Sequence, residues 1–389
     1  MNALTAAYPR RRHPGAALRA IARAPGVVAD ALSGRADAAR VPDADLTPEE
    51  IARYVVASPR ANAYLSVEPD LRAFRTGDGL LTWGASRRHA FVAGGVHARG
   101  DAARLLTDFR DALAGAGYRK ALVFPVAEPE RAALREAGFR GLCVGSEAFV
   151  DLEGFDLGGK AHADLRQMVN RGTKRYGIEV VEVPRERAAA DLAHLYAHWL
   201  AARPLEDPMA LLIGTPCFDR AAGRRFLAAR AGDREAPVAF ITLTPGWDGE
   251  GYGVDVMARE PGAPAGAMDV LLTGAIRMLQ EEGKRVLSLG ACPMAERTPI
   301  PGPDKPLLRR IFRWLYRSRL GNRLFPFESL ARYKDKFDPR WEPVSLSAWP
   351  KMNAWTLYVG CRLWGLFGSP PLVRLPGASA ALQRPETQG

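Results

Sequence analysis

The sequence predicts an α/β protein with mixed sheets and a duplicated unit, and two observations carry this prediction. Helix patterns and strand patterns alternate along the chain instead of falling into separate blocks. The alternation also runs in two rounds of comparable length, and the second round begins near residue 160. At 389 residues the chain is too long for one ordinary core, so we expect two domains.

The first round opens with a helix whose start carries a capping box. In "TPEEIARYVVAS", residues 47–58, Thr47 precedes Glu50 by three positions, which is typical of a helix N-terminus. The other elements follow from runs of β-branched and aromatic residues for strands and from helical spacing of apolar residues for helices. They are strands at 79–85, 89–96, 120–126 and 146–152, a helix at 101–117, and a helix that ends at 135–139.

The second round repeats the alternation, and its first helix is basic. This helix is predicted over 160–177, "KAHADLRQMVNRGTKRYG". The elements expected after it are strands at 178–183, 237–245, 251–258 and 285–291, and helices at 186–202 and 267–283.

These patterns divide the chain into four parts. Residues 1–45 are rich in Ala, Arg, Pro and Gly, which favours a basic, disordered arm. Residues 46–158 and 159–350 are the two expected domains, and 351–389 form an amphipathic and then disordered tail.

The charge and cysteine content limit the partners and the compartment. A net charge of +11 favours a polyanionic partner, either a nucleic acid or an anionic membrane surface. No run approaches the ~20 apolar residues that a spanning helix needs, so we expect a cytoplasmic protein that associates peripherally with the inner face of the cell membrane. The four cysteines include no close pair, which fits a reducing compartment and excludes a zinc site built from cysteines.

Two stretches are candidates for an interface. Residues 305–325 place apolar side chains at helical spacing among seven Lys or Arg and no acid, which is typical of a helix on an anionic membrane. Residues 354–367 are apolar and aromatic but too short to span a bilayer. The alternative is that both helices dock on the protein's own core.

A lysine interrupts the apolar stripe of another predicted helix, in "FESLARYKDKFDPRWEP", residues 327–343. At 100° per residue Lys334 falls among the apolar side chains of this helix, whereas Lys336 points the other way. A buried amine needs water, a carboxylate or an anionic ligand, so Lys334 is either a snorkelling side chain or a site residue.

An aspartate lies within a hydrophobic strand, in "GYGVDVMARE". Asp255 must be exposed, paired or functional there, because carboxylates are depleted in such strands. Arg259 and a glycine-rich loop follow it and lead into a helix, a layout that brings phosphates or a carbonyl to a helix N-terminus.

A pair of histidines has the spacing of metal ligands. His194 and His198 are four residues apart on a predicted helix, but the sequence offers no adjacent glutamate and no obvious third ligand. We therefore expect a structural or solvent-facing pair and no metal.

With these features in order, the chain resembles the cytosolic catalytic region of bacterial phosphatidylglycerol lysyltransferases, the aminoacyl-phosphatidylglycerol synthases. The resemblance runs from about Thr47 to Leu346. It rests on "FVAGGV", "REAGFRGLCVGSEAFVDLEGFDLGGKAHADLRQMVNRGTKRYGIEV", "YGVDVMAREPGAPAGAMDVLL", "LSLGACPM" and "FESLARYKDKFDPRWEP". One departure is Ala258, at a position where the family commonly has an arginine three residues after the aspartate.

The resemblance implies two tandem GNAT-like acyltransferase folds with mixed central sheets, of which the second is catalytic. It implies transfer of an aminoacyl group from an aminoacyl-tRNA to the hydroxyl of phosphatidylglycerol or a related lipid. Since an aminoacyl ester is already activated, this transfer needs a base, a cation or amides for the oxyanion, and exclusion of water, but no cofactor and no metal.

The candidate site residues follow from this chemistry. Asp255 is the expected base or orienting carboxylate, Lys334 the cation for the oxyanion or the terminal tRNA phosphate, and Arg259 the group that holds a phosphate. The expected substrate contacts are Lys336, Arg340, Arg332, Glu147 and Arg166, the last two from the second of the quoted motifs.

Three alternatives stay open. One is an acyl-CoA N-acyltransferase, for which "REPGAP" nearly fits a pyrophosphate loop, although Pro264 lacks a backbone N–H there. Another is aminoacyl-tRNA-dependent transfer to a sterol or to a soluble hydroxylated metabolite. The third is a module that binds lipid or RNA without catalysis.

Overall fold

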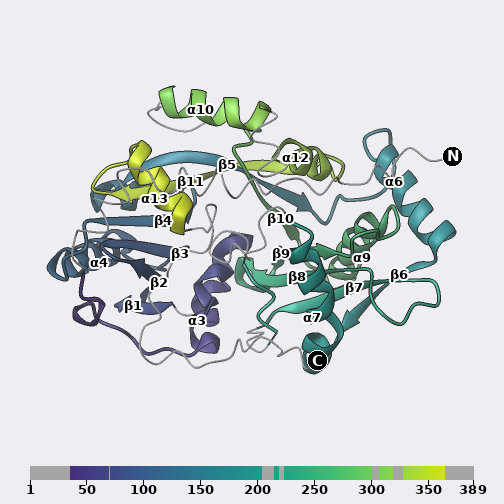
Figure 1. The fold of residues 1–389 in the computed structure, drawn as a ribbon, viewed down its shortest axis with the longest axis horizontal. Coiled ribbons are helices and arrows are strands. Elements are labelled where there is room, and N and C mark those ends of the chain that lie inside the picture. The colour runs from purple at the N-terminus through teal and green to yellow at the C-terminus, as the bar shows by residue number, and fades with distance from the viewer. Residues whose placement is uncertain are drawn as a thin grey trace, which may run out of the picture.

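Eleven strands form one continuous sheet in the computed structural model, which describes residues 36–69, 71–203, 214–218, 223–299, 306–318 and 327–363 (Figure 1). Among these residues the strand order is β1-β2-β3-β4-β11-β5-β10-β9-β8-β7-β6. The predicted α/β class is confirmed. The sheets expected as two are joined edge to edge into a single mixed sheet.

The first half of the sheet is an antiparallel meander followed by a parallel strand. β1, β2 and β3 pair antiparallel, and β3 pairs parallel with β4 because a helix connects them. The elements are α3 (Pro48–Val55), the 3₁₀ helix η2 (Ala61–Val67), β1 (Arg72–Thr76), β2 (Gly79–Ser86), β3 (His89–His97), α4 (Ala102–Gly115), β4 (Lys120–Val126) and α5 (Glu130–Glu136).

The second half repeats this order, which is the duplication that the sequence predicts. Antiparallel strands β6 to β9 lead through a helix to β10, which pairs parallel with β9. The elements are α6 (Ala163–Asn170), the π-helical turn η3 (Arg171–Arg175), β6 (Ile178–Val183), α7 (Arg185–Ala201), β7 (Arg225–Ala231), β8 (Ala239–Gly246), β9 (Gly251–Arg259), α9 (Ala267–Glu281) and β10 (Val286–Pro293).

The last strand of each half lies in the other half. β5 (Arg140–Asp151) follows β4 in the chain, but it pairs with β10 and with β11 (Arg340–Trp349). β11 follows β10 in the chain, but it pairs with β4 and β5. The two halves are therefore held together by exchanged strands at the centre of the sheet.

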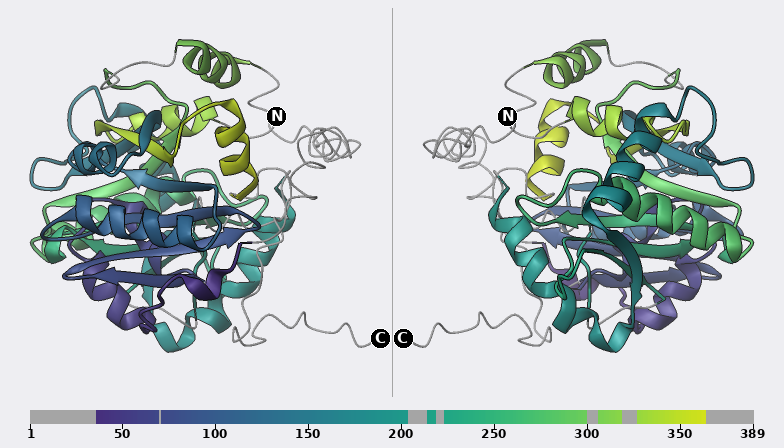
Figure 2. Two further views of the ribbon diagram at one scale, coloured as in Figure 1. Left: turned by 90° about the vertical axis from the view of Figure 1, so that its left-hand side faces the viewer. Right: turned by 90° about the vertical axis from the view of Figure 1, so that its right-hand side faces the viewer.

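Helices cover both faces of the sheet. In β4, Ala121 and Val123 face a core shared with α4 and α5, whereas Leu122 and Phe124 face a core that includes side chains of α10 (Pro306–Arg317) and α13 (Ala354–Leu363). In the second half, α6 and α9 cover one face and α7 covers the other. α10 lies at the periphery of the molecule, outside the sheet (Figures 1 and 2).

Several predicted elements differ in extent. The capping box at Thr47 forms as expected, with Glu50 as the reciprocal partner. The helix predicted over 160–177 is shorter and ends in η3. The sequence patterns missed β1, β7 and β11, and β11 contains Pro343, a residue that argues against a central strand.

The ends of the chain are described in part. Residues 36–45, which the sequence pattern assigns to the arm, pack on the first half: Val41 is buried and Asp43 pairs with Arg72 at 2.7 Å. Residues 1–35 and 364–389 lie outside the described residues, as do 305 and 319–325 of the predicted basic helix. Within the described ranges, no helix is both long and apolar enough to span a bilayer.

Candidate active site

The candidate site lies where β9 and β10 separate. The two parallel strands pair only from Gly251 to Gly253 and from Val286 to Ser288. Beyond that point β9 continues beside β8, and β10 continues beside β5 after a bulge. Ligands of open α/β sheets bind at such divergences, because backbone and side chains there have no neighbouring strand to cover them.

The bulge of β10 brings a lysine into this divergence. Gly290 has φ +83°, and a Cβ there would lie 3.3 Å from the Val254 carbonyl oxygen and 3.7 Å from Lys334 Nζ. A residue other than glycine would strain this conformation and crowd the amine. The bulge therefore holds β9, β10 and Lys334 in close contact.

Lys334 points inward from α12 (Phe327–Asp335), as its helical phase predicts. It is 3% exposed, and its Nζ donates to the carbonyl oxygens of Gly290 at 2.8 Å and Ala291 at 3.2 Å. An ammonium has three donors, and Lys334 also forms a hydrogen bond with the Cys292 thiol, whose pKa is raised by burial and lowered by Lys334. The snorkelling alternative is wrong, because the amine is buried among carbonyls instead of reaching water.

Glu147 lies on β5 at the same divergence. It is 1% exposed and accepts hydrogen bonds from Ser288 Oγ at 2.6 Å and from the Ala61 backbone N–H at 3.2 Å. Ser288 Oγ in turn accepts from the Gly290 N–H at 3.0 Å. Glu147 thus links η2, β5 and the bulge that holds Lys334.

Asp255 lies on β9 beside a buried arginine. Its side chain is 3% exposed, and Arg224 Nη2 lies 3.3 Å from its Oδ2. The same Nη2 lies 3.3 Å from Glu68 Oε1, in the loop after η2. The three side chains form a buried cluster with two carboxyls and one guanidinium, which we call the acidic triad.

The acidic triad is closed by two further neighbours, Thr215 and Tyr64. Thr215 donates to Glu68 through its backbone N–H at 3.0 Å and through its hydroxyl at 2.7 Å. The guanidinium of Arg224 lies 5.6 Å from the ring centre of Tyr64, a cation–π contact. Within the part of the chain that the structure describes, Nε and Nη1 of Arg224 have no hydrogen-bond partner.

Burial changes the protonation of the acidic triad. The pKa of Asp255 is raised from 3.8 to about 7. Desolvation is the main cause, Glu68 also raises this pKa, and Arg224 lowers it. Desolvation also raises the pKa of Glu68, against Arg224 and Thr215. One guanidinium does not offset the burial of two carboxyls, so both keep their protons to a higher pH than exposed carboxyls do.

Arg259 lies apart from the acidic triad. It is exposed at the end of β9, near Tyr333, whose pKa is raised well above the ordinary value by burial and Asp269 and lowered by Arg259. Lys336 binds Asp269 Oδ1 at 3.1 Å in the first turn of α9. These groups form a second, more open cluster beside the start of α9.

The other predicted contacts lie away from the divergence. Arg166 donates to the carbonyl oxygens of Leu157 and Gly159 and so holds the loop after β5. Arg340 pairs with Glu342 and lies over the Phe149 ring. Arg332 is exposed on α12.

Three residues of the site were missed by sequence reasoning: Arg224, Glu68 and Ser288. Arg224 and Glu68 are 156 positions apart, and no local pattern joins them. The available signal was a charged residue at the edge of an apolar run, as in "GRRFLAARA", which is common on protein surfaces.

A separate cavity of about 640 Å³ lies in the first half. Its lining includes Arg53, Arg75 and Arg99 together with the acids Asp78 and Glu130. None of the predicted site residues lines it, so we place the candidate site at the strand divergence.

A sequence model of the family described as "Phosphatidylglycerol lysyltransferase, C-terminal" matches residues 51–348. The phosphatidylglycerol lysyltransferase of Bacillus subtilis is 25% identical over 307 residues, which are 76% of this chain and 34% of that protein. The lysylphosphatidylglycerol biosynthesis bifunctional protein LysX of Mycolicibacterium vanbaalenii is 27% identical over 54% of this chain and 19% of its own length. The chain thus spans about a fifth to a third of these relatives.

Two solved structures have a similar fold. The C-terminal domain of a putative lysylphosphatidylglycerol synthetase from Agrobacterium fabrum has a TM-score of 0.63 and 23% identity, and the match covers 80% of this chain and 95% of that one. The structure of L-PGS from Bacillus licheniformis has a TM-score of 0.66 and 20% identity, with 86% and 99% covered.

Proposed function

The chain belongs to the family described as phosphatidylglycerol lysyltransferase, C-terminal, and from this premise we propose that it transfers an aminoacyl group from an aminoacyl-tRNA to the hydroxyl of phosphatidylglycerol at a membrane surface. The observation that carries the proposal is that two buried charged groups lie on the two strands that separate: the acidic triad beside β9, and Lys334 at the bulge of β10. One of the relatives is named a phosphatidylglycerol lysyltransferase, and the other is named for lysylphosphatidylglycerol biosynthesis.

Asp255 would activate the attacking hydroxyl. A carboxyl whose pKa is about 7 exchanges its proton near neutral pH, which suits a general base. The hydroxyl oxygen forms a bond to the ester carbonyl carbon, and its proton passes to Asp255. The ester bond to the tRNA ribose then breaks, and the proton leaves with the ribose oxygen. Arg224 would hold Asp255 in place.

Lys334 would stabilise the tetrahedral oxyanion. Two of its donors are held by the Gly290 and Ala291 carbonyls, so the amine has little freedom to lose, and an oxyanion would replace the Cys292 thiol as the partner of the third. A buried cation is most effective in a site from which water is excluded. Glu147 would act through Ser288, by fixing the bulge on which Lys334 rests.

Basic groups beside the site suit the polyanionic donor. Arg171, Lys174 and Arg175 are exposed on η3, which packs beside the start of α9. Arg259 is exposed at the end of β9 and would hold a phosphate of the lipid or of the tRNA.

The start of α9 is a poor site for the pyrophosphate of coenzyme A. A Cβ on Gly266, the residue before α9, would lie 2.4 Å from the Met168 carbonyl oxygen and 3.3 Å from Gly172. α6 and η3 therefore cover this helix N-terminus, where a phosphate would need free backbone N–H groups. Asp269 adds negative charge in the first turn. These contacts argue against the acyl-CoA alternative.

α10 favours a lipid acceptor over a soluble metabolite. Leu308 and Phe312 are each 7% exposed and pack on the core, whereas Ile311 and Trp314 are 41% and 57% exposed. Arg310 and Arg317 are exposed on the same helix. An outward pair of large apolar side chains among arginines is typical of a helix that lies on an anionic membrane.

The full-length chain is expected to sediment with phosphatidylglycerol vesicles and much less with neutral ones, and high salt should weaken binding because it screens exposed charges. Ile311→Ser with Trp314→Ser should reduce the bound fraction several-fold, since ~0.8 kcal/mol is lost per CH₂ withdrawn from the membrane. Ala189→Ser with Ala193→Ser, which changes two exposed apolar positions of α7, is the control. Equal recovery from neutral and anionic vesicles would contradict the proposal.

The rate of transfer should depend on pH through Asp255. Below its pKa of about 7 the base is protonated, so the single-turnover rate should fall about tenfold per pH unit, and above it the rate should level off. The measurement is transfer from preformed aminoacyl-tRNA between pH 5 and 8, corrected for spontaneous ester hydrolysis. A rate that stays flat across this range would exclude Asp255 as the base.

The proposed function is tested by product analysis. The purified chain is incubated with total aminoacyl-tRNA and vesicles that contain phosphatidylglycerol, and the lipids are analysed by mass spectrometry. We expect an aminoacylated phosphatidylglycerol that disappears when the tRNA is first digested with ribonuclease. Parallel reactions with a sterol or a soluble polyol test the other acceptors, and product only in those reactions would overturn the lipid assignment.

A further inference from the structure

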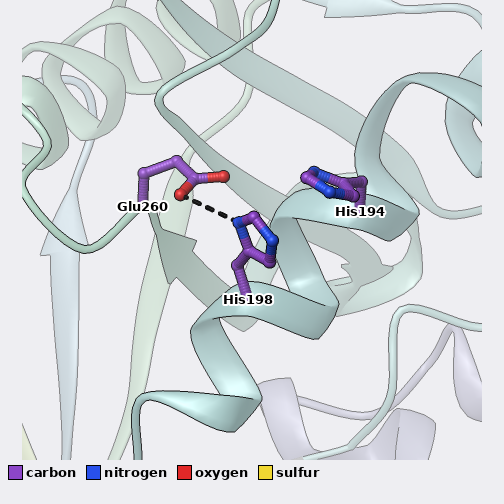
Figure 3. Close-up of side chains that lie close together, drawn as sticks. All are labelled: His194, His198 and Glu260. Carbon is purple, nitrogen blue, oxygen red and sulfur yellow. Dashed lines mark hydrogen bonds and ion pairs between the residues drawn. The ribbon is translucent and has the colours of Figure 1, made fainter.

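Two histidines and a glutamate converge where α7 passes the end of β9. His194 and His198 lie one turn apart on α7, and Glu260 directly follows β9 (Figure 3). Figure 3 shows the two imidazole rings and the carboxylate on the same side of α7. The sequence offered no third ligand, because Glu260 is 62 positions from His198 and only the fold brings it there.

The distances among these groups are close to those of a metal site. One ligand atom from each residue lies within 4.8 Å of the others, and His198 Nδ1 is 3.4 Å from Glu260 Oε2. Two ligands held at 2.0–2.1 Å by one tetrahedral ion lie roughly 3.3 Å apart. The His198–Glu260 pair already has this separation, and the His194 side chain is exposed, so no packing contact of the core holds it in place.

The chemistry of the three ligand groups indicates which metal ion they would bind. Two imidazole nitrogens and one carboxylate oxygen suit zinc and other borderline divalent ions, whereas magnesium and calcium prefer oxygen alone. A set of three protein ligands leaves at least one position for water. Because all three residues are partly exposed, an ion can enter without opening the fold.

The hydrogen bond between His198 and Glu260 does not by itself explain the cluster. At 3.4 Å it is near the upper limit for such a bond, and the side chains are 51% and 28% exposed, so it contributes little to stability. It also gives no role to His194, whose ring centre lies 4.0 Å from that of His198. A shared cation would use all three side chains at once.

We infer that His194, His198 and Glu260 form a zinc-binding site. The ion would join α7 to the end of β9, the strand that carries Asp255, and would oppose separation of the helix from the sheet. The site is independent of the proposed transfer reaction, because none of its residues is assigned a part in that chemistry. Binding to the folded chain alone raises the thermal midpoint.

The test is a zinc titration of the full chain without a histidine tag, after treatment with EDTA, by isothermal calorimetry. We expect one zinc ion per chain and a higher melting temperature with zinc than with magnesium. His194→Ala, His198→Ala and Glu260→Gln should each weaken zinc binding by at least about tenfold. Loss of a group that only hydrogen-bonds to a metal ligand already weakens binding by about this much, and loss of a ligand itself should cost no less. Glu186→Gln, an exposed acid on the same helix, is the matched control.

The outcomes are distinguishable. Melting curves in EDTA test whether the variants are folded. We expect all three to fold, because the three positions are at or near the surface. Loss of binding in the three variants with binding kept in Glu186→Gln supports the site. Binding that is equal in the wild type and in His198→Ala or Glu260→Gln would place zinc elsewhere, and no binding by the wild type would overturn the inference outright.

Discussion

Replacing Asp255 by asparagine is expected to slow the chemical step of aminoacyl transfer by about 100-fold or more, the usual cost of losing a general base. The amide keeps the shape of the side chain but cannot accept the hydroxyl proton. Binding of tRNA and vesicles should change little, because the side chain is 3% exposed and lies beneath the surface. Single-turnover transfer, with Asp233→Asn as an exposed control, measures the effect.

The stability of the same variant separates a catalytic role from a structural one. The folded-state pKa of Asp255 is raised from 3.8 to about 7, so its stabilising contribution is complete below pH 3.8 and is lost as the pH rises through 7. Asparagine does not titrate, so the Asp255→Asn protein does not lose this stability as the pH rises. The melting temperature of Asp255→Asn relative to wild type should therefore be higher at pH 8 than at pH 5. A destabilised variant with normal turnover would show that the carboxylate only pairs with Arg224.

Replacing Lys334 is expected to have an effect of similar size. Loss of one donor to an oxyanion typically lowers the rate by about 10²- to 10³-fold. Lys334→Met keeps most of the aliphatic volume, whereas Lys334→Ala also opens a cavity in a position that is 3% exposed. Both leave the Gly290 and Ala291 carbonyls without this donor, so rates must be corrected for the folded fraction.

Lys336 provides the comparison on the same segment. It pairs with Asp269 at 3.1 Å and lies 5.2 Å from the Tyr333 ring centre, in a more open environment than Lys334. Lys336→Ala should therefore cost only a few-fold in rate, roughly 1 kcal/mol or less. Equal losses in the Lys334→Met and Lys336→Ala proteins would show that the inward direction of Lys334 has no catalytic meaning.

The sequence predicted those parts of the site that depend on local periodicity. The phase of Lys334 within residues 327–337 follows from 100° per residue, and the structure confirms that this side chain is buried. The isolation of Asp255 in an apolar strand likewise predicted that it must be exposed, paired or functional, and the structure shows a buried side chain beside Arg224. The pairing partner could not be predicted, because Arg224 directly precedes β7, a strand that the patterns missed.

The part of the fold that could not be predicted from the sequence also depends on contacts between distant segments. Helices and most strands of both rounds were predicted, since each carries its own pattern. The single sheet was not, because it depends on β11 lying between β4 and β5. β11 also begins with charged residues and contains Pro343, so local propensity opposed a central strand. The division at residues 158 and 159 stays a prediction.

The exchanged strands have a consequence for synthesis of the chain on the ribosome. β4 and β5 are complete by Asp151, but β11, which pairs with both, begins at Arg340. At 5 to 20 residues per second, the intervening stretch of about 190 residues takes roughly 10 to 40 s to translate. During that interval two strand edges at the centre of the future sheet have no neighbour and are open to other chains. Nascent copies of this chain therefore expose these edges to one another until β11 emerges.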